Sequence, residues 1–373
     1  MAYTTIDDPS AYFQTVLWTG DDQTDRAITN TGNSDLQPDL VWIKSRNDTY
    51  DHVVVDSSRG ASTSTTGKQL STNLADTEPS NTNGHVKSFN SDGFNVRSGS
   101  SGGNPLVGVN KNNITYVAWQ WKVNGGTATT SQSESGSNIA CSVQANTTSG
   151  FSIITYTGTG GSGHTILHGL GSAPQVVIAK GRSVGNHWRV YHKANTSQPE
   201  TDSLKFNDND ATADHSGWWD DTAPSSTEIA LGNDDNTNED GSTYVAYAWK
   251  AIKGFSKFGG YKGNGDNDGP LIYTGFKPAM LIIKCNVGHG ESWHIWDNKR
   301  VLLGGNPNQA AVSPDTTGQD TQSSTPYNID FLSNGFKIRE DHDITNGDGD
   351  NYIYMAWAEN PFVSSEGIPT TAA

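Results

Sequence analysis

A pattern that occurs three times along the chain constrains its fold more than any other feature of the sequence. In each copy a proline is followed by apolar residues and, at the sixth position, by a lysine. The copies are Pro38–Lys44, Pro174–Lys180 and Pro278–Lys284. Their spacing is far longer than a solenoid repeat of about 20–50 residues. We therefore expect three tandem domains.

Shared segments flank this pattern on both sides. Strand-like segments ending in Thr-Gly precede it, as in Val16–Gly20 and Ile153–Gly158. Each copy closes on an aromatic segment: Tyr116–Trp119, Tyr244–Trp249 and Tyr352–Trp357. This alignment places Trp119, Trp249 and Trp357 at equivalent positions, where we expect them in the core.

The local pattern is that of strands and turns. Apolar residues come in short runs bounded by Gly, Pro, Asn and Asp, and helical periodicity is nearly absent. Asp92-Gly93 and Asn334-Gly335 are typical of tight hairpin turns. The sequence therefore predicts an all-β protein of three tandem, homologous, β-sandwich-like domains with long polar loops.

Composition and repeat positions suggest the domain boundaries. Residues 124–149 are rich in Gly, Ser and Thr and are expected to form a linker. The expected order is repeat 1 at 1–123, the linker, repeat 2 at 150–253, repeat 3 at 254–362 and a C-terminal tail at 363–373. The joint between repeats 1 and 2 is expected to be the looser one.

Charge and hydropathy exclude two classes of partner. The formal net charge is −16 and no three basic residues are consecutive, which argues against binding to nucleic acid. No apolar run approaches the about 18 residues of a membrane span, and the N-terminus does not resemble a signal peptide, so we expect no membrane insertion and synthesis in the cytoplasm. Cys141 and Cys285 predict neither a disulfide framework nor a zinc site.

Motifs of catalysis are weak. Gly158–Gly163 spells a dinucleotide-binding motif and Gly99–Gly103 a nucleophile motif, but neither is followed by a predicted helix. Glycan hydrolysis needs two carboxyl groups at a fixed separation, one with a raised pKa. The acidic loops have no apolar surroundings that would raise a pKa, so we expect no enzyme, with a glycan hydrolase as the minor alternative.

Two loops carry oxygen ligands of the kind that calcium prefers. The candidate ligands are Asp343, Asn346, Asp348 and Asp350 in one loop, and Asp266 and Asp268 in the other. Neither loop fits an EF-hand, and Asx turns are the alternative interpretation. No other cofactor is expected.

The adjacent tryptophans Trp218 and Trp219 suggest a binding surface. Two neighbouring residues of an extended segment cannot both point inward, so we expect one ring to be exposed. Exposed aromatic rings stack on sugars or anchor protein interfaces. Trp218, Trp219, Asp220 and Asp221 are therefore the candidate residues for binding a glycan or a partner.

Longer motifs carry a resemblance to a known family. They are GFSIITYTG (Gly150–Gly158), HGLGSAP (His168–Pro174), Phe255–Ala279, DFLSNGFKIR (Asp330–Arg339) and AENPF (Ala358–Phe362). With them the chain resembles virion proteins of tailed phages that infect marine bacteria, which are labelled tail-fibre, tail or structural proteins.

The resemblance implies a place on the exterior of a phage particle and contact with other virion proteins. It favours a host-facing tail appendage that binds a surface glycan or an outer-membrane component. The alternative is a capsid decoration that stabilises the particle. It implies no catalytic residue. Two symmetries stay open, a homotrimer and one chain that is pseudo-threefold by itself.

Overall fold

The computed structural model of the protein describes residues 3–60, 67–78, 80–81, 84–98, 108–301, 305–321 and 327–370. Within these ranges antiparallel sheets dominate, and the helical turns are short: η1 (Pro9–Ala11), α1 (Ser216–Trp219) and α2 (Asp235–Asn238). The prediction of an all-β protein is confirmed. No helix in the described ranges is long and apolar enough to cross a membrane.

The first part of the chain, unit 1 (residues 3–123), forms two main sheets. The larger sheet has the order β1 (Phe13–Thr19), β9 (Thr115–Trp121), β3 (Leu40–Ser45) and β4 (Val53–Asp56). The smaller has the order β2 (Arg26–Ile28), β8 (Gly93–Ser98) and β7 (Gly84–Asn90), and β5 (Gly67–Lys68) pairs with β6 (Ser80–Asn81). Apolar side chains such as Trp18 and Phe94 fill the space between the two main sheets.

Unit 2 (residues 124–253) contains the widest sheet. Its order is β10 (Thr130–Gln132), β11 (Cys141–Asn146), β12 (Phe151–Thr157), β19 (Thr243–Trp249), β14 (Val176–Gly181), β15 (Arg189–His192), β16 (Asp202–Lys205) and β17 (Ala213–Asp214). A second, two-stranded sheet pairs β13 (His164–Leu167) with β18 (Glu228–Leu231).

The expected linker 124–149 is therefore corrected. It contains β10 and β11, and β11 pairs with residues 151–156 of β12. The physical reason is an alternating pattern within the Ser- and Thr-rich segment: Ile139, Cys141 and Val143 all point into the core of unit 2.

Unit 3 (residues 254–362) again has two sheets. One has the order β20 (Ser256–Lys262), β26 (Asn351–Pro361), β22 (Phe276–Val287) and β23 (His294–Asp297). The other has the order β21 (Leu271–Tyr273), β25 (Gly335–Ile338) and β24 (Ile329–Leu332).

One strand order recurs in all three units. It is β1-β9-β3-β4, β12-β19-β14-β15 and β20-β26-β22-β23. In each, the residue two positions after the repeated proline lies opposite a tryptophan: Leu40–Trp121, Val176–Trp249 and Met280–Trp357. Trp121, and not Trp119, is thus the equivalent of Trp249 and Trp357. The sequence alignment was wrong by two residues because β9 carries a tryptophan at both positions.

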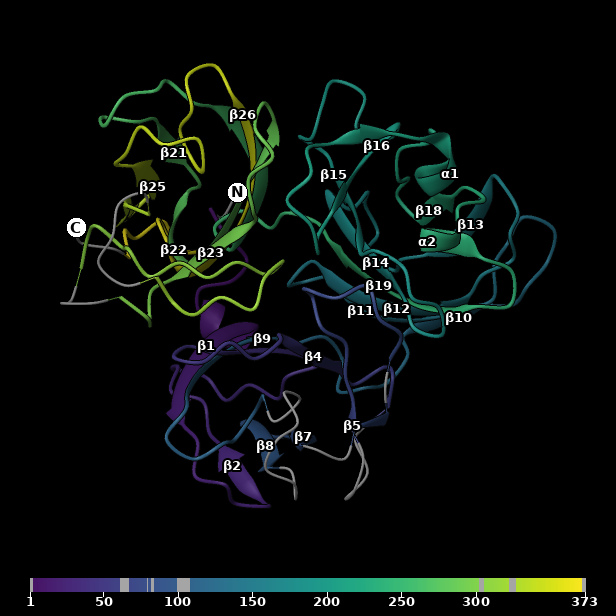
Figure 1. Ribbon diagram of the computed structural model, residues 1–373, viewed down its shortest axis with the longest axis horizontal. Coiled ribbons are helices and arrows are strands. Elements are labelled where there is room, and N and C mark those ends of the chain that lie inside the picture. The colour runs from purple at the N-terminus through teal and green to yellow at the C-terminus, as the bar shows by residue number, and fades with distance from the viewer. Residues whose placement is uncertain are drawn as a thin grey trace.

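The three units surround a common centre, as Figure 1 shows. Trp121, Trp249 and Trp357 meet there, with ring centroids 5.3–6.3 Å apart. All three rings are buried in one apolar cluster to which every unit contributes. The units therefore share a core, and units 1 and 2 each have a further core between their own sheets.

The repeated lysines lock neighbouring units together. Each is fully buried, and its Nζ donates to a backbone carbonyl of the next unit around the ring: Lys44 to Thr317 (3.2 Å), Lys180 to Ala75 (3.1 Å) and Lys284 to Asn209 (3.1 Å). Burial lowers the pKa of each lysine to about 8. The contacts run from unit 1 to 3, from 3 to 2 and from 2 to 1, which closes the ring.

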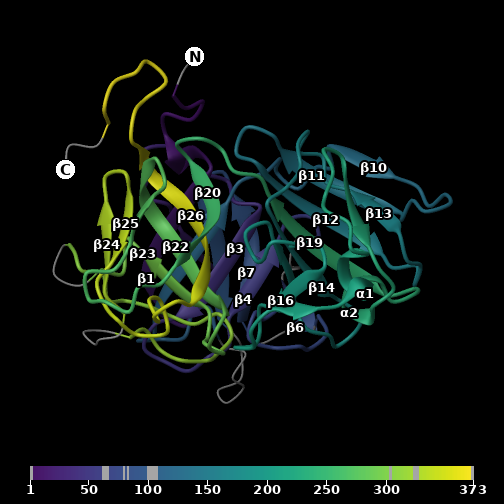
Figure 2. The same ribbon diagram turned by 90° about the horizontal axis from the view of Figure 1, so that it is seen from above.

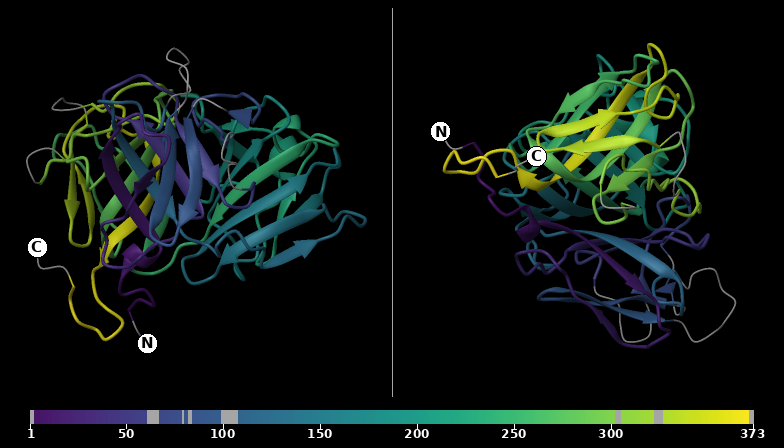
Figure 3. Two further views of the ribbon diagram at one scale, coloured as in Figure 1. Left: turned by 90° about the horizontal axis from the view of Figure 1, so that it is seen from below. Right: turned by 90° about the vertical axis from the view of Figure 1, so that its left-hand side faces the viewer.

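Both ends of the chain leave the ring on the same side, as Figures 2 and 3 show. Ser365 N–H donates to Asp7 Oδ1 at 2.7 Å, so the terminal segments lie together. We call this side the terminal face. Strands β9, β19 and β26 run toward it, so the loops that precede them lie on the opposite side, the loop face.

Replacing one central tryptophan tests the shared core. We expect Trp249→Ala to lower the free energy of unfolding by about 3–5 kcal/mol, because it leaves a cavity where three units meet. Leu271→Ala is the control, since Leu271 is 53% exposed and should change stability by less than about 0.5 kcal/mol. Urea unfolding measures both. Equal stabilities of the two variants would contradict a shared core.

Candidate functional site

Two acidic loops of unit 3 lie side by side on the loop face, and Asn346 joins them. Its buried Nδ2 donates to Asn264 Oδ1, the Asp266 carbonyl and the Glu340 carbonyl, each at 2.8 Å. The Asn264 N–H donates back to Asn346 Oδ1 at 2.9 Å. The side chain of Asn346 is fully engaged in bracing the loops, so it is not placed as a calcium ligand.

The same brace occurs in each unit and has a signal in the sequence that lies outside the proline-to-lysine pattern. An asparagine stands six residues before the tyrosine of the closing strand: Asn110–Tyr116, Asn238–Tyr244 and Asn346–Tyr352. In every unit the tyrosine hydroxyl accepts the N–H of the residue after the asparagine, at 2.7–3.0 Å. This spacing therefore fixes the loops on which unit 3 carries its polar site.

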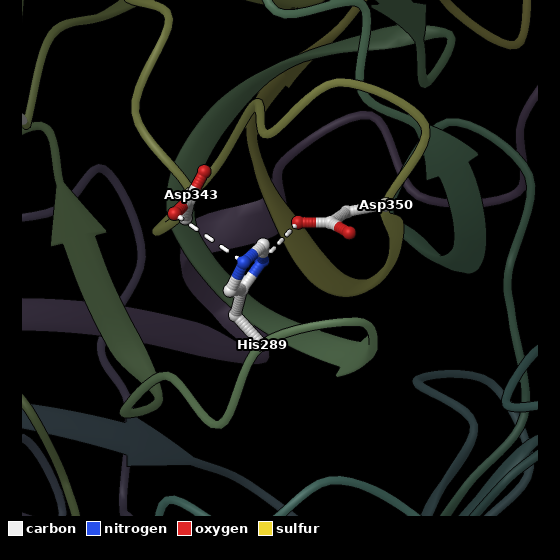
Figure 4. Close-up of side chains that lie close together, drawn as sticks. All are labelled: His289, Asp343 and Asp350. Carbon is white, nitrogen blue, oxygen red and sulfur yellow. Dashed lines mark hydrogen bonds and ion pairs between the residues drawn. The ribbon is translucent and has the colours of Figure 1, made fainter.

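Three titratable side chains converge beside this brace, as Figure 4 shows. His289 Nδ1 lies 2.8 Å from Asp350 Oδ2, and His289 Nε2 lies 3.7 Å from Asp343 Oδ2. Asp350 is buried, Asp343 is half-buried and the imidazole is exposed. Gly288 and Gly347 make the approach possible, since a Cβ at either position would overlap the Asp350 carboxylate.

The cluster can hold a proton or a metal ion. The hydrogen bond from His289 to Asp350, and then the charge of Asp343, raise the pKa of His289 above its usual 6.5. One imidazole nitrogen with two carboxylates lies within 4.8 Å, a donor set that suits zinc or manganese better than calcium, which prefers oxygen ligands alone. His289 was not predicted as a site residue because it lies in a different loop from the two aspartates.

The candidate calcium ligands of the two loops are placed differently. Only Asp343 and Asp350 come together within the described residues. Asp266 Oδ1 accepts the Asp268 N–H at 2.8 Å, as in an Asx turn. Asp268 pairs with Lys337 at 2.8 Å, and Asp348 is exposed. A calcium site in either loop stays a prediction.

The expectation that Trp218 or Trp219 is exposed is wrong. Their exposed fractions are 5% and 1%. The segment is not extended but forms the helical turn α1, which points both rings into the core of unit 2. The Arg189 guanidinium lies 4.0 Å from the Trp218 ring, and Trp219 packs edge-on against Tyr191.

The two aspartates after this turn are placed differently. Asp220 ends α1 in the left-handed region and accepts a hydrogen bond from Ser162 Oγ at 2.5 Å. Asp221, also at positive φ, is exposed. Neither neighbouring tryptophan ring is exposed, so the physical basis of the binding-surface prediction is lost here.

The titration of His289 tests the geometry of the polar cluster. The protonated imidazole stabilises the fold below its unfolded-state pKa of about 6.5, and this contribution is lost as pH rises through the raised folded-state pKa. NMR titration of the parent should give a pKa above 6.5, and Asp350→Asn should lower it. His187 is the internal control, because burial lowers its pKa and the substitution should not change it. An unchanged His289 pKa in Asp350→Asn would contradict the pairing.

Comparison with known proteins identifies the family and no more. No curated protein and no solved structure matches the chain at a significant level. The family described as "Domain of unknown function (DUF7483)" matches residues 8–361, which is nearly the whole chain. The protein therefore belongs to the DUF7483 family.

Proposed function

We propose that the protein is a structural component on the exterior of a phage particle, a host-facing tail appendage made of three copies of one β-sandwich-like domain. The observation that carries the proposal is the closed ring of three units with one strand order. Such a ring gives a single chain the threefold form that assemblies otherwise obtain from three chains. The resemblance to phage virion proteins supports the same role.

The two faces of the ring suit two different roles, attachment to the particle and recognition of the host. Both chain ends lie on the terminal face, together with the exposed side chain of Ile368. Attachment to other virion proteins through this face leaves the loop face directed outward. The loop face carries the His289 cluster, and loops on a rigid β scaffold are the usual place for recognition. Its partner in this proposal is a host glycan or an outer-membrane component.

A capsid decoration is the second candidate, and the pseudo-threefold ring itself favours it. One chain of this form matches a local threefold position of a capsid without forming a homotrimer. The proposal then assigns particle stabilisation, and not host contact, to the same molecule.

Location on the intact particle tests the proposal. Purified virions are labelled with an antibody against the protein and imaged by electron microscopy. We expect label on the tail, because a host-facing appendage must be displayed there. Label on the capsid would replace the first candidate by the second. A protein absent from purified particles would contradict both.

A further inference from the structure

Strand β1 is the edge of the unit 1 sheet. Phe13 and Thr15 are buried, but no other strand of the described residues pairs with the outer side of β1. Lys122 N–H donates to the Tyr12 carbonyl and Gly20 N–H to the Ile114 carbonyl, so even-numbered residues bond toward β9. Hydrogen-bonded pairs alternate along an antiparallel ladder, so the backbone groups of Phe13, Thr15 and Leu17 point away from β9. No strand among the described residues pairs with that edge.

The equivalent edge in unit 2 is occupied. Strand β12 corresponds to β1, and β11 pairs along its outer side, with Gln144 opposite Ile153. Gln144 also reaches across the boundary to unit 1. Its Nε2 donates to Ser57 Oγ and Ser58 Oγ at 2.9 Å, and its Oε1 accepts the N–H of Asn124 at 2.9 Å.

A cavity of about 180 Å³ lies at the corresponding boundary between units 3 and 1, on the terminal face. Its walls include Phe13, Gln14 and Thr15 of β1. The opposite wall includes Asn298, Lys299 and Asn360, which are the equivalents of Ser57, Ser58 and Asn124. The cavity therefore lies where a residue equivalent to Gln144 would place its side chain.

Only unit 2 has a strand on this edge among the described residues, since β20 of unit 3 is an outer strand like β1. Residues 124–149 cross from unit 1 to unit 2 and supply β11 on the way. Residues 3–11 contact unit 3 at the boundary between units 3 and 1, but they form no strand beside β1. Two buried polar atoms are left at the cavity as a result: Thr15 Oγ1 and Asn298 Oδ1 have no hydrogen-bond partner among the described residues.

We propose that the edge of β1 and this cavity form an acceptor site for an extended polypeptide strand of a partner protein. The strand adds to β1 as β11 adds to β12, and it directs one amide side chain toward Asn298 and Asn360. Strand addition to a free sheet edge is a general mode of peptide recognition, in which backbone hydrogen bonds supply affinity and side-chain pockets supply specificity. The inference rests on the proposed attachment to other virion proteins and names the kind of segment that attaches.

The chain itself supplies the probe. A labelled peptide of residues 139–146, with Cys141 replaced by serine, copies the strand that fills the equivalent edge in unit 2. Fluorescence anisotropy measures its binding to the purified full chain. We expect saturable binding below about 1 mM, and a Gln144→Ala peptide should bind more weakly.

Two protein variants separate backbone pairing from side-chain effects. Thr15→Pro removes an outward N–H without removing a bond to β9, and should weaken binding about tenfold or more. Thr15→Val keeps the N–H and nearly the same shape, and should bind like the parent. Melting temperatures of both variants confirm that they fold.

A modified peptide makes the test independent of variant folding. The Gln144 N–H of the peptide would face β1, so N-methylation there should abolish binding even to the parent protein. Equal binding of the methylated peptide, or no binding of the parent peptide up to about 1 mM, would overturn the proposal. Self-association of the chain that Thr15→Pro abolishes would also overturn it, since the occupant would be a second copy. These results do not depend on particle location, so the proposed function can fail separately.

Discussion

The rest of the structure depends on the burial of Trp121, Trp249 and Trp357 where the three sheets meet. A buried tryptophan removes about 150–250 Å² from water, worth about 4–6 kcal/mol at about 25 cal/mol per Å². Each ring is covered by the other two units, so a separated unit would expose it. Units 1 and 2 also have cores between their own sheets, but closure of the ring is what completes the burial of the third, shared core.

Polar contacts around this core show how different side chains serve one geometry. Tyr247 donates to Asp56 at 2.7 Å across one boundary, and Trp119 donates to Asp297 at 3.0 Å across another. At the third boundary the residue equivalent to Trp119 and Tyr247 is Met355, whose side chain has no hydrogen-bond donor. The residue equivalent to Asp56 and Asp297 is His192, whose Nε2 lies 3.2 Å from the Tyr354 carbonyl of unit 3. Burial lowers the pKa of His192 to about 4, which keeps the ring neutral. A hydrogen bond therefore crosses this boundary too, but here the donor is the histidine that replaces the aspartate.

The sequence predicted the repeated strands well, but it predicted the positions of single side chains less well. The proline and the lysine hold equivalent positions in β3, β14 and β22. They do so because each lysine bonds the next unit and the strand between the two residues has the same length in every unit. Trp119 was misplaced because two tryptophans on one face of β9 look alike without the pairing partner. Trp218 was misplaced because a single helical turn leaves no periodicity to detect. His289 joined Asp343 and Asp350 through tertiary structure alone, which no spacing along the chain encodes.

Departures from the threefold repetition indicate where function resides on this fold. Positions that all units share, such as Asn110, Asn238 and Asn346, are occupied by bonds that hold the scaffold together. A feature present in one unit only is not needed to hold the scaffold together. The acidic cluster with His289 occurs in unit 3, and an added edge strand occurs in unit 2. Because three copies already supply the core, one copy can change a loop or gain an edge strand without opening the ring. The resulting asymmetry places the His289 cluster on unit 3 and the added strand on unit 2, so the units differ in the surface that each presents.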